Sequence, residues 1–241
     1  MAQRSTHSSV AVQIVVNHLT RMTKGYICVG GVDVETGNHI RPVLGRRLTA
    51  ELLTMNGGMF DIGARVDLGH VTDVGHPPET EDHAFDPAEA AIRDYLPPAE
   101  FWRLLLEKAE NSLATIFGPA LTQRRSSCTV ELGQGAGSLG VLRPESASIE
   151  VNNFGKLRLL MSDRQFNVDL SLADLRLYDG NYEPDEGLVA DISARIGRGV
   201  PTLVSVGLTR AWRKSNDTTE RHWLQANNLH LADRPDWRKT I

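Results

Sequence analysis

Short runs of apolar and β-branched residues, each closed by turn-forming residues, recur along almost the whole chain. The runs at 10–16, 26–34 and 39–43 come first, and Gly37 and Asn38 between the last two tolerate the backbone of a tight turn. Later runs occupy residues 64–74, 128–132, 139–142, 146–151, 156–161, 165–170, 175–178, 202–208 and 223–231. Runs of this length and spacing are typical of strands in a small barrel or sandwich. The chain is therefore predicted to be mainly β.

The segment at 64–74 carries the clearest alternation of apolar and polar residues. Val66, Leu68 and Val71 occupy the positions expected to face the core, and Gly69 interrupts the alternation. A glycine inside a strand often marks a bulge, so we expect an irregularity at this position. Pro42 lacks a backbone donor, so the strand at 39–43 is expected to lie at an edge or to end there.

A few short helices are predicted between these strands. Residues 76–86 are acidic and polar and are expected to form a loop, after which Asp86 and Pro87 resemble the start of a helix. Apolar residues recur at helical spacing over 98–111 and again over 185–196, where Gly197 is expected to end the helix.

Composition excludes several classes of protein. The chain has 241 residues, with 26 Lys and Arg against 30 Asp and Glu, and a net charge of −4 argues against a histone-like protein that holds nucleic acid through bulk charge. No apolar run approaches the length of a membrane span, and residues 1–9 are polar, so neither membrane insertion nor secretion is predicted. Cys28 and Cys128 each stand alone in an apolar run, which indicates reduced core residues and a cytoplasmic protein.

The charge is unevenly distributed. Residues 1–65 carry seven Lys and Arg against four Asp and Glu, and residues 206–241 repeat that balance. Residues 66–122 carry three against eleven. If the basic ends fold beside each other, they form a local positive patch on an acidic protein; ordinary solvated charge is the alternative interpretation.

Sequence motifs do not predict an enzyme. The glycine pattern at 135–140 matches a dinucleotide-binding loop, but the residues that follow read as a strand, whereas that loop requires a helix. His70, His76 and His83 lie among acidic residues, yet their spacing is unlike that of a structural zinc site. No catalytic residue, cofactor or metal is therefore predicted, and a metal-dependent enzyme using the 70–83 loop is kept as an alternative.

The basic residues near the two ends point to a different chemistry. Guanidinium groups bind phosphates, and an exposed aromatic ring stacks on any base, which are the requirements for binding single-stranded nucleic acid. In the competing interpretation, Trp212 fills the end of a barrel and the arginines pair with Asp217 and Glu220. The candidate residues are Arg21, Lys24, Arg41, Arg46, Arg47, Arg210, Trp212, Arg213 and Lys214.

Five segments together resemble a known family. They are IVVNHLTR at 14–21, YICVGGVDVETGNHIRPV at 26–43, SLGVLRP at 138–144, SVGLTRAW at 205–212 and HWLQANNLH at 222–230. The chain resembles the prokaryotic dual OB-fold-containing domain family. This resemblance implies two OB-like small barrels packed together, with two or three short helices, and a nucleic-acid-binding or sensing role in a defence system.

The resemblance also bears on the predicted domain division, site residues and partners. It implies a first lobe at 1–122, with a helical insertion near 87–111, and a second at 123–241, the two being intertwined. It marks Arg21, Arg41 and Arg210 as the polar positions of its motifs. In a structural alternative, Arg41 joins the barrels through a buried carboxylate such as Asp33. The predicted partners are single-stranded DNA or RNA and an effector protein. A sensor of nucleotides or small ligands and a protein-interaction adaptor are the alternatives, and the oligomeric state is left open.

Overall fold

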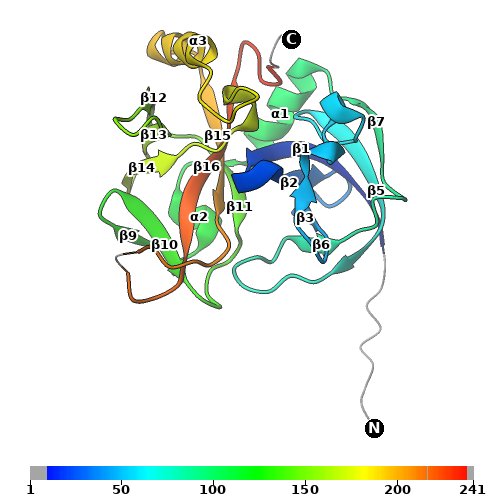
Figure 1. Cartoon of the computed structure of the whole chain (residues 1–241). Helices are drawn as coiled ribbons and strands as arrows, with labels where there is room; N and C mark the ends of the chain where they lie inside the picture. Colours follow the sequence, from blue (N-terminus) through cyan, green and yellow to red (C-terminus); the bar gives the residue numbers. More distant parts are fainter. Residues whose placement is uncertain (1–9, 216, 238–241) are drawn as a thin grey trace.

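The computed structural model describes residues 10–215 and 217–237, and the chain is mainly β. Two lobes lie side by side in Figure 1, the first coloured from blue through cyan to the green of α1, and the second from green to red. We call β1–β7 with α1 the first lobe, and β8–β16 with α2 and α3 the second lobe. The predicted fold class, two packed OB-like units with short helices, is confirmed. The helices are α1 (Pro98–Lys108), α2 (Leu113–Phe117) and α3 (Glu186–Gly197).

The first lobe is a closed barrel. Its long first strand pairs with β2 through residues 14–21 and with β5 through residues 10–15, so β1, β2, β3, β6 and β5 form a ring. A five-stranded barrel of this kind is the architecture of an OB fold. The strands are β1 (Val10–Arg21), β2 (Tyr26–Asp33), β3 (His39–Val43), β4 (Leu48–Thr49), β5 (Ala64–Asp73), β6 (Asp82–Ala84) and β7 (Ala91–Tyr95).

The alternation predicted for β5 is confirmed. Val66, Leu68 and Val71 are buried in the first lobe. Gly69 has a φ of +67°, and the pairing of β5 with β1 shifts register beside it, as a bulge requires. The bulge bends β5, which lets the strand pair with β1 and β6 along different parts of its length.

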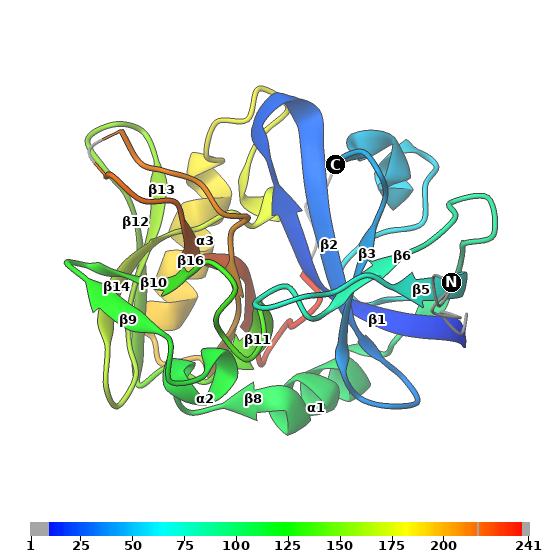
Figure 2. The same ribbon diagram turned by 90° about the horizontal axis from the view of Figure 1, so that it is seen from below.

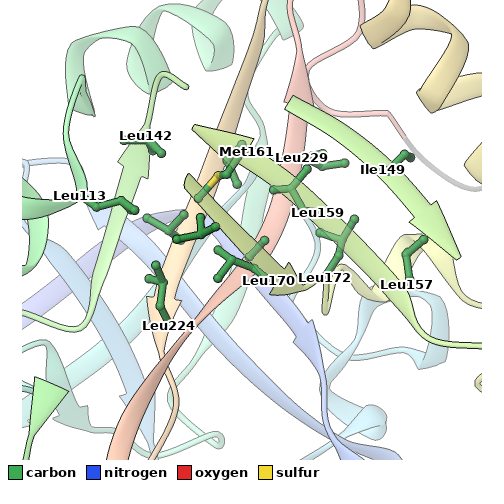
Figure 3. Close-up of a cluster of buried hydrophobic side chains, with 14 of the residues drawn as sticks. Leu113, Leu142, Ile149, Leu157, Leu159, Met161, Leu170, Leu172, Leu224 and Leu229 are labelled. Carbon is green, nitrogen blue, oxygen red and sulfur yellow. The ribbon is translucent and has the colours of Figure 1, made fainter. Parts of the chain in front are cut away.

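The second lobe consists of two sheets around a shared core. The six-stranded sheet has the order β8-β11-β15-β16-β10-β9, and the second sheet has the order β12-β13-β14. Leucines and a methionine from both sheets and from α2 meet between them (Figure 3). The strands are β8 (Ala109–Glu110), β9 (Thr122–Arg124), β10 (Ser127–Glu131), β11 (Leu139–Leu142), β12 (Ser146–Val151), β13 (Leu157–Ser162), β14 (Asn167–Ser171), β15 (Thr202–Leu208) and β16 (Arg221–Leu231).

The lobes have separate hydrophobic cores. One contains side chains from residues 12–105 together with Val141 and Leu203, and the other contains side chains from residues 113–237. The α2 side chains Leu113 and Phe117 precede the division predicted at 122 and 123, yet they lie in the second core. The position of that division stays a prediction, and residues 1–9, 216 and 238–241 of its ranges lie outside the described residues.

Hydrogen bonds join the lobes along β1 and β16. Asn228 accepts the backbone N–H of Leu19 at 2.7 Å and donates to the Leu19 carbonyl at 3.1 Å, so one side chain takes the place of a paired strand. Ser205 donates its hydroxyl to the carbonyl of Asn17, and the Arg21 N–H donates to the carbonyl of Ala173. The family-like segments at 14–21, 205–212 and 222–230, from opposite ends of the chain, therefore meet at this boundary between the lobes. We call this boundary the seam.

Buried histidines at the seam predict acid sensitivity. His18 is 1% exposed and His230 is 0% exposed. Burial, with His39, His230 and Arg41 nearby, holds the pKa of His18 well below its usual 6.5, and burial beside Arg176 lowers the pKa of His230 to about 3. Below pH 6.5 these histidines take up protons in the unfolded chain while staying neutral in the folded one, so stability falls as pH falls through this window.

The expected loss is about 1.4 kcal/mol per pH unit for each of the two histidines once the pH is below 6.5. Urea unfolding at pH 7.5 and 5.5 measures the difference. An unfolding free energy that is the same at both pH values contradicts this account.

Three local predictions were wrong. Residues 76–86 include strand β6, whose pairing with β3 and β5 could not be read from its acidic sequence. No helix begins at Asp86, because its side chain accepts the N–H of Ala88 in a turn and the chain then pairs with β5 as β7. The predicted strand at 175–178 is the short 3-10 helix Leu175–Leu177, where Asp174 accepts the N–H of Arg176.

One prediction needs a smaller correction, because the helix at 98–111 ends at Lys108, before β8. Of the two outcomes predicted for the strand with Pro42, the second is observed: β3 lies between β2 and β6 and ends one residue after Pro42. Among the described helices, none is both long and apolar enough to cross a membrane.

Candidate functional site

Two of the predicted basic residues, one from each lobe, form ion pairs with the same carboxylate, that of Asp82. Arg41 is only 3% exposed, and its Nε donates to Asp82 at 2.5 Å. Arg210 in the second lobe donates to the other oxygen of the same carboxylate at 2.5 Å and lies 3.4 Å from Glu79. The carboxylate that holds Arg41 is thus Asp82 and not Asp33. This buried ion pair gives Arg41 a structural role.

The glycine-rich segment at 135–140 also contacts this acidic stretch. Glu81 accepts hydrogen bonds from the backbone N–H groups of Ser138 and Leu139 and from the Ser138 hydroxyl, at 2.7 to 3.0 Å. The segment runs into β11 and not into a helix. Its backbone donors therefore bind an anion, but that anion is a carboxylate of the first lobe.

Two of the predicted basic residues of the first lobe lie over tyrosine rings. The Arg21 guanidinium lies 3.9 Å from the centre of the Tyr178 ring and 6.0 Å from that of Tyr182. Arg47 lies 5.3 Å from the centre of the Tyr26 ring. We call this group the seam patch; it consists of Arg21, Lys24, Tyr26, Arg46, Arg47, Tyr178 and Tyr182.

Backbone strain marks the point where the two lobes face each other in the seam patch. Lys24 and Tyr182 both have positive φ, 62° and 64°, which is uncommon for residues with a side chain. The Tyr182 hydroxyl lies 3.0 Å from where a Cβ on Gly25 would be, so the loop of the second lobe reaches the hairpin of the first. Strained residues of this kind cluster at binding sites. The Tyr182 ring is 38% exposed.

One predicted basic residue of the second lobe, Lys214, lies over one of a pair of tryptophans. The rings of Trp212 and Trp223 are 6.0 Å apart, and the Lys214 ammonium lies 3.5 Å from the centre of the Trp223 ring. Trp212 is 45% exposed, so it does not fill the end of a barrel. We call Trp212, Arg213, Lys214 and Trp223 the tryptophan patch.

The loop that carries the tryptophan patch is fixed by ion pairs. Arg221 is buried and donates to Glu131 and Asp217, both at 2.6 Å, and its backbone pairs with that of Trp212. The pairing expected with Asp217 is thus made by Arg221 and not by Arg213. Burial, with Arg158 nearby, lowers the pKa of Lys214.

The two patches project from one side of the molecule. The β1–β2 hairpin, the yellow segment near residue 178 and the orange loop before β16 all reach the upper edge of Figure 2. Within the described part of the chain, no carboxylate lies at ion-pair distance from Arg21, Lys24, Arg46, Arg47, Arg213 or Lys214.

Sequence reasoning missed the aromatic partners of the first-lobe cations. Tyr178 and Tyr182 lie more than 150 residues from Arg21 along the chain, and no local pattern links them. Tyr26 was placed in a strand but not in a site. Its position next to the basic hairpin was a signal that could have identified it.

The three histidines of the 70–83 region lie beside a carboxylate or backbone carbonyls. His70 lies 3.6 Å from Glu89, whereas the Nδ1 atoms of His76 and His83 face backbone carbonyls at 3.0 and 2.9 Å. Across residues 10–215 and 217–237, no three His, Cys, Asp or Glu side chains are arranged to hold a metal ion.

The arrangement of two OB-like units agrees with a comparison of sequence families. The pattern of the dual OB-containing domain matches residues 12–239. The chain belongs to this family. Among curated proteins, none matches the sequence.

Some solved structures of HIN and DNA-binding proteins are distantly similar. The Ifi202 HINa domain in complex with 20-base-pair double-stranded DNA shares 9% identity and a TM-score of 0.34, over 92% of this chain and 100% of that chain. The p204 HINb domain shares 9% identity and a TM-score of 0.36 over the same fractions. A murine DNA-binding protein bound to double-stranded DNA shares 5% identity and a TM-score of 0.33, over 91% and 92%. At this level of similarity, what those proteins bind says nothing about this chain.

Proposed function

We propose that this protein binds single-stranded nucleic acid, DNA or RNA, across the seam patch and the tryptophan patch, and that it catalyses no reaction. The observation that carries the proposal is the set of unpaired cations placed beside aromatic rings on one side of the molecule. Lysine and arginine bind the phosphates of a strand, and exposed rings stack on its bases. OB barrels use a strand face and flanking loops in this way.

The exposed rings favour a single strand over a duplex. Bases in a duplex are stacked on each other, and their faces are covered, whereas those of a single strand can stack on Tyr182 and Trp212. Arg210 makes a smaller contribution to phosphate binding. Its side chain is paired with Asp82 but is 53% exposed. The proposal includes the sensing role that the family resemblance implied, in which a separate effector protein responds to the bound strand.

Salt dependence tests this proposal. If about four phosphates are neutralised, raising monovalent salt from about 50 to about 200 mM is expected to weaken binding of a single-stranded oligonucleotide about 50-fold. Fluorescence anisotropy with labelled poly-dT and poly-U strands measures the affinity. A duplex of the same length is the control and is expected to bind more weakly. Failure of both strands to bind at low salt, or tighter binding of the duplex, contradicts the proposal.

A further inference from the structure

The outer strand of the small sheet has an open edge beside a helix. β12 is an end strand of the sheet β12-β13-β14, and α3 lies next to it (Figure 1). A groove of about 640 Å³ runs between them. Its lining includes Ile149, Glu150 and Val151 from the strand and Glu186, Val189 and Ala190 from the helix.

The register of β12 shows which of its backbone groups point away from β13. Asn152 donates its N–H to Lys156 at 2.9 Å, and pairs along β12 and β13 alternate from that point. Ser148 and Glu150 therefore bond to β13, whereas the N–H and C=O groups of Ala147, Ile149 and Val151 point away from it. Within the described residues, no backbone group pairs with these three on their outer side.

From this edge we infer a docking site for a partner protein: an extended peptide segment rich in lysine or arginine and small apolar residues adds to β12 as a further strand, in the groove beside α3. Peptides bind by strand addition where a free edge supplies main-chain hydrogen bonds and neighbouring pockets receive alternate side chains. Here the open edge supplies the hydrogen bonds, and Val151, Val189 and Ala190 supply the apolar contact. The inference does not depend on nucleic-acid binding.

Charge determines the kind of occupant. Glu150, Glu183 and Glu186 all line the groove, and in the part of the chain that the structure describes no cation lies at ion-pair distance from them. A basic segment satisfies these carboxylates. A second copy of this chain would instead bring its own Glu150 and Glu186 against them, and like charges at close range oppose pairing.

A direct test uses a fluorescein-labelled eight-residue peptide that alternates valine and lysine. We expect saturable binding to the wild-type protein in fluorescence anisotropy, and N-methylation of the peptide amides that face the strand is expected to weaken it about tenfold or more, because each removes a main-chain hydrogen bond. A valine and glutamate peptide is expected not to bind. Absence of binding by the lysine peptide at about 1 mM, or equal binding of its N-methylated form, overturns the inference.

Protein variants complete the test. Glu150→Gln/Glu186→Gln is expected to weaken the lysine peptide about fivefold, while Glu100→Gln/Glu107→Gln on α1, with the same change in charge, leaves it unchanged. Oligonucleotide affinity is expected to be the same in both variants, so failure here is distinguishable from failure of the proposed function. Sedimentation that shows a dimer strengthened by Glu150→Gln/Glu186→Gln assigns the edge to a second copy and overturns the inference.

Discussion

The Asp82→Asn variant is expected to lose about 3–5 kcal/mol of unfolding free energy, because it leaves the buried charge of Arg41 without a counterion. Asp82 is the carboxylate shared by Arg41 and Arg210, one from each lobe. Arg41 is almost fully buried, so water cannot replace the lost carboxylate. Urea unfolding followed by circular dichroism at neutral pH measures the loss.

Arg210→Ala is the matched control for that prediction. It removes the partly exposed member of the same network and leaves Arg41 paired with Asp82, so it is expected to cost at most about 1 kcal/mol. A loss in Asp82→Asn of only about 1 kcal/mol, no larger than that of the control, would mean that Arg41 does not depend on Asp82 and contradicts this account.

The second large effect concerns binding. Removal of both exposed rings in Tyr182→Ala/Trp212→Ala is expected to weaken single-stranded oligonucleotide binding by about 2–6 kcal/mol, which is about 30-fold or more, because stacking contributes about 1–3 kcal/mol per base. Both side chains are exposed in the free protein, so their loss is expected to change the melting temperature little. Fluorescence anisotropy at constant salt measures the affinity.

A variant that keeps an aromatic ring at both positions is the control. Tyr182→Phe/Trp212→Phe keeps a stacking face at both positions and is expected to bind within about threefold of the wild type. If the alanine variant binds as tightly as the phenylalanine variant, bases do not stack on these two residues, and the proposed surface is wrong.

Much of the fold could be predicted because local pattern and tertiary structure agree. The alternation of Val66, Leu68 and Val71 with a bulge at Gly69 requires only the two-residue period of a strand and the backbone freedom of glycine. By contrast, β6 is only three residues long and acidic, and it is a strand because β3 and β5 pair with it. A separate pairing, of β7 with β5, overrides the helix signal at Asp86. These pairings depend on the partner strands and leave no signal within the short segments themselves.

The candidate site, like the fold, could be predicted from the sequence only in part. A chain with arginines at both ends indicates where phosphates can bind, and the seam brings Arg21 of β1 beside the second lobe. The sequence could not show that Asp82 forms ion pairs with Arg41 and Arg210, because both arginines lie far from Asp82 along the chain. It also could not show that Tyr178 and Tyr182 face Arg21. Charge pattern therefore predicts candidates, and only the fold shows that Arg41 is buried in an ion pair, whereas Arg210 is paired but partly exposed.

Photocrosslinking tests the location of the proposed surface most directly. A single-stranded oligonucleotide with a photoreactive base at every position is irradiated with the wild-type protein, and the crosslinked peptides are identified by mass spectrometry. We predict crosslinks in the peptides that carry Tyr26, Tyr182 and Trp212, which lie in the seam and tryptophan patches. Crosslinks confined to other parts of the chain, or none at low salt, contradict the central claim.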